Sequence, residues 1–145
     1  MAILENAMFA HLNIRSLAWW LWAILAGLLV WGLTGDPLAR EAAIALALLQ
    51  AAGSLSVHRN VTHFPTQLRI AYALWMAASF VQPLSIMYWI LAVGTTARVL
   101  TGYCAMARLL LLLPWNRSVS LTWRRMATIA FHPPVEGSVV TGLPL

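Results

Sequence analysis

The side chains best suited to chemistry gather near residue 100. Cys104 is the only cysteine in the chain, and Arg98 and Arg108 flank it. Neighbouring cationic groups favour the thiolate form of a cysteine, which is the nucleophile in sulfur and redox chemistry. A thiol that serves in sulfur relay or redox sensing is therefore one hypothesis. The favoured alternative is a small, inert residue at a helix end, because the chain has no second cysteine to resolve an oxidised Cys104.

The same arginines suggest a site for an anion. Arg98 is the only charge in the apolar run from residue 86 to residue 104, and a lone charge within or at the edge of a membrane span marks a functional candidate. With Arg108 and Arg117 it would contact anionic lipid headgroups or another anionic ligand. The favoured interpretation is that Arg98 and Arg108 extend to the headgroups at the end of the span and perform no chemistry.

Histidines offer the other candidate chemistry. His58 ends an expected helix and His63 lies in the loop that follows. An imidazole such as that of His58 can ligate haem or a chlorophyll-type pigment. Four-helix membrane cytochromes generally pair histidines from facing helices, and no other expected span contains one. We therefore expect no bound cofactor, with haem or a pigment at His58 as the alternative.

Composition places these residues in a membrane. Of the 145 residues, 61% are hydrophobic and 9% are charged, and the mean hydropathy is +0.78. A soluble domain of this size has no core large enough for so much apolar surface. The net charge of +5 comes from arginines that flank apolar segments, so lipid headgroups rather than nucleic acid are the expected partners. No acidic residue is expected in mid-span, because Glu41 belongs to the first turn of its helix and the others lie outside the spans, which disfavours proton transfer or a di-metal centre.

Four apolar segments are expected to cross the bilayer as two helical hairpins. A helix needs about 20 residues to span the hydrocarbon core. Residues 16–34 and 38–57 form the first hairpin, with Asp36 as the cap of its second helix. Residues 65–104 form the second and turn at Pro83, because one helix kinked there would be nearly twice as long as the core is thick. Four tryptophans of the first helix are expected to anchor at the headgroups: Trp19, Trp20, Trp22 and Trp31.

The remaining segments set the expected topology. Residues 105–113 are too few to span and should lie in the interface, followed by an amphipathic surface helix. Most arginines then fall on one side of the membrane, against Arg40 on the other, which predicts a bacterial inner-membrane protein with both termini in the cytoplasm. The expected parts are an N-terminal transmembrane hairpin (residues 1–61), a second hairpin with an interfacial elbow (62–117) and a cytoplasmic tail (118–145).

Small residues are expected to hold the first hairpin together. A ridge of small side chains on one helix lets a neighbouring helix approach closely. The ridge on the second helix and the matching notch on the first are Ala43, Ala47 and Ala51, and Ala23 and Gly27. Gln50 is the one strongly polar side chain in mid-span, and we expect it to hydrogen-bond to another helix.

The end of the second hairpin resembles a known family. It reads Gly-Tyr-Cys-Ala-Met-Ala-Arg-Leu-Leu over residues 102–110 and Leu-Pro-Trp-Asn-Arg over residues 113–117. This is similar to the close of the small YgaP-type transmembrane domain, where Phe and Gly are usual in place of Tyr103 and Ala105. The resemblance covers about residues 66–117 and implies a two-helix hairpin. In the best-known arrangement a rhodanese domain with the catalytic cysteine precedes that hairpin. Two expected spans stand in its place, so the resemblance implies no catalytic sulfur transfer.

Together these features predict an all-α integral membrane protein with four transmembrane helices and a short interfacial helix. Its expected function is that of a non-catalytic accessory, assembly or scaffolding subunit that acts through helix packing and lipid contacts. Its expected partners are a bilayer with anionic lipids and other membrane protein subunits or further copies of itself. The alternatives are sulfur relay or redox sensing through Cys104, and a haem- or pigment-associated subunit of a photosynthetic or respiratory complex.

Overall fold

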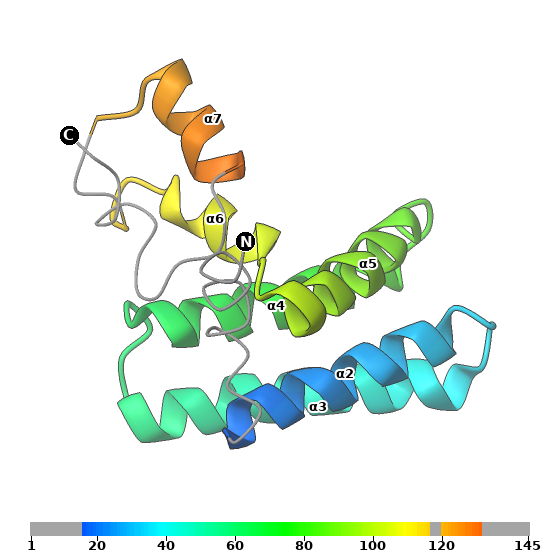
Figure 1. Cartoon of the computed structure of the whole chain (residues 1–145). Coiled ribbons are helices and arrows are strands. Elements are labelled where there is room, and N and C mark those ends of the chain that lie inside the picture. The colour runs from blue at the N-terminus through cyan, green and yellow to red at the C-terminus, as the bar shows by residue number, and fades with distance from the viewer. Residues whose placement is uncertain (1–15, 117–119, 132–145) are drawn as a thin grey trace, which may run out of the picture.

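The computed structural model describes residues 16–116 and 120–131, and the regular elements among them are all helices. The all-α class is therefore confirmed, whereas Arg117 lies outside the described residues. The described helices, shown in Figure 1, are α2 (Leu17–Gly32), α3 (Pro37–His58), α4 (Phe64–Ser79), α5 (Ile86–Thr101), α6 (Ala105–Leu111) and α7 (Trp123–Phe131).

Helices α2 to α5 form a four-helix bundle made of the two expected hairpins. Helix α3 packs against α2 and α4, and α5 packs against the same two helices, so the four helices close into a ring. Short turns join α2 to α3 and α4 to α5, as Figure 1 shows. The chain leaves helical structure between Ser79 and Ile86. A hairpin at Pro83 was therefore the right expectation, and one long kinked helix is excluded.

Local capping explains where the first helices begin and end. The side chain of Ser16 accepts a hydrogen bond from the backbone N–H of Trp19 at 3.1 Å. Asp36 caps α3 in the same way by accepting from Leu38 N at 2.9 Å, with Pro37 as the first helical residue. Such caps satisfy N–H groups that have no partner inside the helix.

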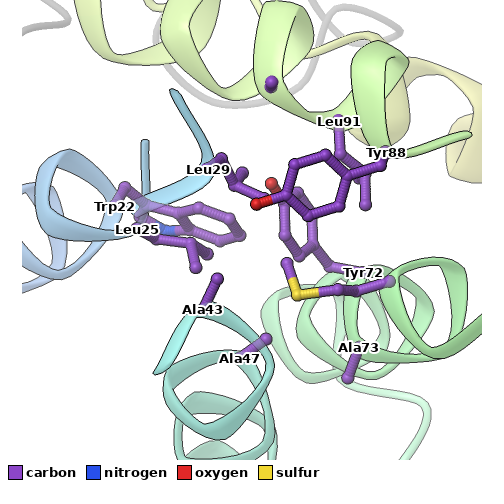
Figure 2. Packing of buried hydrophobic residues seen from close by; sticks show 11 residues of the cluster. Trp22, Leu25, Leu29, Ala43, Ala47, Tyr72, Ala73, Tyr88 and Leu91 are labelled. Atoms are coloured by element: carbon purple, nitrogen blue, oxygen red, sulfur yellow. The ribbon is translucent and has the colours of Figure 1, made fainter. Parts of the chain in front are cut away.

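Aromatic and small side chains share the core of the bundle. The Trp22 and Tyr72 rings meet edge to face with their centroids 5.0 Å apart. Ala43 and Ala47 of α3 lie beneath them, fully buried, which confirms the small-residue ridge for these two positions (Figure 2). Trp22 is 5% exposed, so its expected role as a headgroup anchor was wrong. The ring fills the space that the alanines leave.

The prediction that Ala23 and Gly27 form a matching notch on the first helix was also wrong. Gly27 is exposed, and a Cβ atom there would meet nothing within 4 Å. Ala23 is only partly buried. Ala51, the third residue of the ridge on α3, is also partly buried but packs against the core cluster. Helix α2 instead turns large side chains inward, Trp22, Leu25 and Leu29 among them, because it has to fill the space between α3 and α5. Gln50 does bond across helices as expected, since its Nε2 donates to Leu21 O at 3.5 Å.

Not every bundle helix meets the length and hydropathy expected of a membrane span. Among the described helices, α3 is long and apolar enough to cross a bilayer alone. Helices α5 and α6, which meet at a bend of 97°, make a second span if they are counted together. Helix α2 is apolar but shorter. One or two candidate spans are thus present, and four spans stay a prediction.

Helices α6 and α7 cover one end of the bundle (Figure 1). Helix α6 packs against α4 and carries α7 on its other side. Helix α7 is amphipathic and turns Ile129 inward while Trp123 and Phe131 stay exposed. The expected elbow and surface helix are therefore present, and they close the end of the bundle to which Arg98 belongs.

Candidate functional site

The turn from α5 into α6 brings Arg98 and Cys104 together. Helix α5 ends at Gly102, whose φ of 74° lies in the left-handed region that glycine adopts without strain. Cys104 then caps α6, and its Sγ accepts a hydrogen bond from Ala107 N at 3.4 Å. Arg98, one turn before the end of α5, donates from Nη1 to the same Sγ at 3.2 Å. The sulfur therefore has a cationic donor and a backbone donor.

Arg98 points into the bundle. Its guanidinium lies over the Trp22 ring, 4.1 Å from the centroid, and its side chain is half-buried. A cation over an indole ring gains about 0.5–2 kcal/mol, with the larger values where water is excluded. The expectation that Arg98 extends outward to headgroups was therefore wrong, because Trp22 and Cys104 offer it partners inside the protein.

Arg108 is more deeply buried still. It is 6% exposed, and its Nη1 donates to Ile129 O in the last turn of α7. The hydroxyl of Tyr103 donates to the next carbonyl, Ala130 O, and its ring lies 4.3 Å below the Arg108 guanidinium. The last carbonyls of a helix have no intrahelical donor and carry partial negative charge. Arg108 therefore holds α7 against α6. The expectation that it extends outward to lipid headgroups was wrong.

Two cavities meet at the Arg98–Cys104 contact. The larger has a volume of about 390 Å³ and is lined mainly by apolar side chains of α2, α4 and α5. Trp19 also lines it, and the Trp19 Nε1 donor is buried without a hydrogen-bond partner. The smaller measures about 70 Å³ and reaches Tyr72 and Thr95. Cys104 lines both cavities and is partly exposed, so a small reagent has a route to its sulfur.

Further hydrogen bonds, which no sequence pattern predicts, lie close to the Arg98–Cys104 pair. Thr95 donates to Leu91 O at 2.7 Å, so its single hydroxyl proton is used and Tyr72 must be the donor in the bond between their hydroxyls. Arg69 Nη1 donates to Ser54 Oγ at 3.0 Å on the neighbouring helix. These residues are far apart in the chain, and no local spacing signals their contact.

The histidines lie apart from this site. The rings of His58 and His63 stack with their centroids 4.0 Å apart at an interplanar angle of 23°, and His58 is exposed. Within residues 16–116 and 120–131, no group of three or more His, Cys, Asp or Glu side chains could hold a metal ion. The structure thus brings the two histidines together, and the expected absence of a cofactor stays a prediction, with ligation by His58 as its alternative.

No family model, curated protein or solved structure matches this chain. The resemblance to the YgaP-type domain therefore stays a prediction.

The arrangement around Cys104 limits the chemistry that it can perform. Acidic groups suited to act as a general base are absent from it, because the described acidic residues, Asp36 and Glu41, stand at the other end of the bundle at the start of α3. A thiolate beside a guanidinium can be alkylated by an electrophile. It can also take the outer sulfur of a partner's persulfide or attack a partner's disulfide to form a mixed disulfide, and in both cases a thiolate of the partner leaves.

Proposed function

We propose that the protein is an integral membrane accessory or assembly subunit of a bacterial inner membrane. In this proposal α2 to α5 cross the bilayer as two hairpins, and α6 and α7 lie on the cytoplasmic side. The observation that carries it is the distribution of polarity, with apolar side chains outside the bundle and polar side chains inside.

The outer surface of the bundle is strongly apolar. Only 28% of the most apolar window of α3 is buried within the protein, whereas the core helix of a soluble protein is mostly buried. All four helices expose large apolar side chains, among them Trp20, Ile24 and Val30 on α2, Leu48 and Leu49 on α3, Leu74 on α4, and Trp89, Ile90 and Val93 on α5. Exposed apolar patches on a soluble protein seldom exceed a few hundred Å². Lipid tails are the covering that fits such a surface.

Polar side chains take the opposite position. The buried polar residues of the bundle are Gln50, Ser54, Thr66, Ser79 and Thr95. Ser54 and Thr66 share a hydrogen bond of 2.9 Å between α3 and α4. A helix on the surface of a soluble protein turns its polar face outward. Transmembrane bundles are usually stabilised by hydrogen bonds between their helices and by small residues where the helices touch.

Helix length is compatible with this proposal. Helices α2, α4 and α5 have 16 residues each, or about 24 Å against a hydrocarbon core of about 30 Å. The turns add to this length, since Leu33 and Thr34 continue the hydrogen bonding of α2 beyond Gly32. A bilayer adapts to a span that is slightly short at modest cost.

Charge favours one orientation. Arg59, Arg69, Arg98 and Arg108 belong to the end of the bundle covered by α6 and α7, whereas Arg40 stands at the other end with the described acidic residues. Positive residues concentrate on the cytoplasmic side of inner-membrane proteins. The end with α6 and α7 is therefore the cytoplasmic one in this proposal.

Cysteine labelling tests the topology. In a Cys104→Ser background, Asn60→Cys and Thr34→Cys place single thiols in exposed turns at opposite ends of the bundle. A membrane-impermeant maleimide added to intact spheroplasts should label residue 34 and should label residue 60 only after permeabilisation. The cysteine-free parent is the matched control. Labelling of both positions from one side, or release of the protein by alkaline carbonate, would contradict the proposed spans.

Purification in a mild detergent tests the accessory role. The protein should co-purify with other membrane proteins in a fixed stoichiometry. Deletion of the gene that encodes this protein should remove those proteins from the complex that they form. A preparation that contains only copies of this chain would contradict the accessory role while leaving the topology untouched.

A second candidate function rests on Cys104. We infer from the Arg98–Sγ contact of 3.2 Å and the two adjoining cavities that the thiolate takes the outer sulfur of a partner's persulfide, or attacks a partner's disulfide, with release of the partner's thiolate. Persulfide trapping in membranes should then give a signal that Cys104→Ser abolishes. The alkylation rate should also fall in Arg98→Met, which removes the donor that holds Sγ beside the cavities, whereas Arg59→Met, which removes an exposed arginine, should change neither readout. Equal alkylation rates in the two arginine variants would reject this candidate.

A further inference from the structure

A third cavity, separate from the two near Cys104, lies at the opposite end of the bundle. It has a volume of about 290 Å³ and is formed where α3 begins, α4 ends and α5 begins. This is near the lower limit of about 300–1,000 Å³ for ligand pockets. The side chains that carry the argument are Arg40, Ser79, Gln82, Ser85 and Tyr88, all of which line the cavity.

Arg40 supplies a positive charge at the wall of the cavity. Its Nε donates to Gly32 O at 3.0 Å, and its guanidinium lies 5.2 Å from the centroid of the Tyr88 ring. These contacts fix the side chain at the wall of the cavity. Among the residues described, Arg40 forms no ion pair and its two terminal nitrogens have no acceptor. A guanidinium held in this way keeps the donors that grip oxyanions best.

Tyr88 adds a donor that is left without a partner. It is 5% exposed, and its buried hydroxyl has no hydrogen-bond acceptor. An unpaired buried hydroxyl costs about 1–3 kcal/mol, so its retention needs a reason. Ser79 donates its proton to Met76 O at 2.6 Å. Gln82 and Ser85 are exposed at the rim, and no side-chain hydrogen bond occupies either of them in the described part of the chain.

The cavity thus has several side chains able to donate a hydrogen bond, one positive charge and no acidic residue among its lining. A complementary ligand carries negative charge and several acceptor oxygens. We propose that this cavity binds a phosphate group, either as free inorganic phosphate or as the headgroup phosphate of an anionic phospholipid. The donors come from three elements, α3, the turn after α4 and α5, and a phosphate group has enough acceptor oxygens to bind donors from more than one of them.

Binding of two probes to the full-length protein in detergent tests this site. One probe is inorganic phosphate and the other is dioleoyl phosphatidylglycerol in mixed micelles, with dioleoyl phosphatidylcholine as the zwitterionic reference. Both are followed by thermal shift and by the ligand retained in native mass spectrometry. Arg40→Gln should weaken the effective probe about tenfold. Arg59→Gln removes an exposed arginine at the other end of the bundle and should leave the probe bound as in the parent.

Tyr88→Phe provides a variant that keeps the ring in the core. Since the hydroxyl has no partner to lose, the protein without probe should unfold at an unchanged or higher temperature, while affinity for the probe falls several-fold. A purely structural Tyr88 would lose stability and keep its affinity, which is the reverse pattern.

The outcomes separate the two sources of phosphate. An effect of phosphatidylglycerol beyond that of phosphatidylcholine, lost in Arg40→Gln, identifies a lipid headgroup, and the same pattern with inorganic phosphate identifies a free anion. Absence of both effects overturns the proposal, and so does equal binding by the Arg40→Gln and Arg59→Gln variants. The phosphate arm does not depend on the proposed membrane function, so the two proposals can fail separately.

Discussion

The two ends of the bundle use the same pairing of an arginine with an aromatic ring, but they leave the arginine in different states. At one end Arg98 lies 4.1 Å from the Trp22 ring centroid and also donates to Cys104 Sγ. At the other end Arg40 lies 5.2 Å from the Tyr88 ring centroid and donates to the backbone through Nε alone. The Arg98 guanidinium is bound by groups of the protein, and we call its end of the bundle the engaged end. The terminal nitrogens of Arg40 have no acceptor among the described residues, and we call its end the available end.

The difference comes from what the chain places over each end. Helices α6 and α7 fold across the first end and bring acceptors with them, Cys104 Sγ for Arg98 and Ile129 O for Arg108. Of the elements that the structure describes, the short turns after α2 and α4 close the other end. An arginine at an end of this bundle therefore becomes structural or available according to the acceptors nearby, and its sequence position does not decide between them.

Trp22→Ala is the strongest test of the engaged end. It removes the ring that packs on Tyr72 and supports Arg98, and a large-to-small change at such a buried position typically costs about 3–5 kcal/mol. We expect a loss of this size in the free energy of unfolding, measured by denaturant titration in detergent. Trp20→Ala, at a position 54% exposed on the same helix, is the control and should cost far less. Similar losses of unfolding free energy in the two variants would show that Trp22 is not a core residue that supports Arg98.

Arg108→Gln tests whether α7 is held by the engaged end. The change removes a charged donor to Ile129 O, which should cost about 1.5–3 kcal/mol. The loss should be local, so amide hydrogen exchange should rise in α7 while the bundle helices stay protected. Arg124→Gln alters an exposed arginine on α7 itself and serves as the control. If both variants leave α7 equally protected, Arg108 does not anchor that helix.

Much of the helical framework could be predicted because its signals are local. Asp36 and Pro37 mark the start of α3, and Pro83 marks the turn between α4 and α5, each through a backbone preference that acts over a few residues. The elbow at Cys104 follows from the short apolar segment that comes after it. The hairpins, the short helix α6 and the amphipathic α7 are therefore present as expected, while the position of α6 at a membrane interface stays a prediction.

The candidate site was harder to predict because its contacts are not local. Spacing placed Ala23 and Gly27 on one face of α2, yet it could not say which face meets α3 and α5, and Gly27 proved exposed. Tryptophan is a residue type that often anchors at headgroups, and only the position of Trp22 between helices makes it a core residue. Arg98 and Arg108 were read as outward-reaching because their acceptors, Cys104 Sγ and Ile129 O, come from elements whose placement depends on a bend of 97°.

Gly32→Ala addresses the available end. A Cβ at residue 32 would collide with the Tyr88 hydroxyl and would lie 3.0 Å from Arg40 Cγ. Overpacking of this kind costs about 1–3 kcal/mol, and it should also displace Arg40 from the cavity. Combining it with Tyr88→Phe removes the nearest clashing atom and should recover part of the unfolding free energy. Gly27→Ala, where a Cβ meets nothing within 4 Å, is the control. Equal effects at the two glycines would mean that α2 does not approach α5 closely at this end.

Cys104→Ser should have the smallest effect and bears on why a cysteine stands at the engaged end. Serine is among the best N-cap residues, and its hydroxyl can accept from both Ala107 N and Arg98 Nη1. We expect the unfolding free energy to change by less than about 1 kcal/mol, whereas Cys104→Ala, which accepts neither bond, should cost about 0.5–2 kcal/mol. A larger loss for serine than for alanine would show that packing of the sulfur matters more than its hydrogen bonds. If serine matches or exceeds the stability of the natural chain, capping cannot explain the choice of cysteine, and the argument for thiol chemistry at this end becomes stronger.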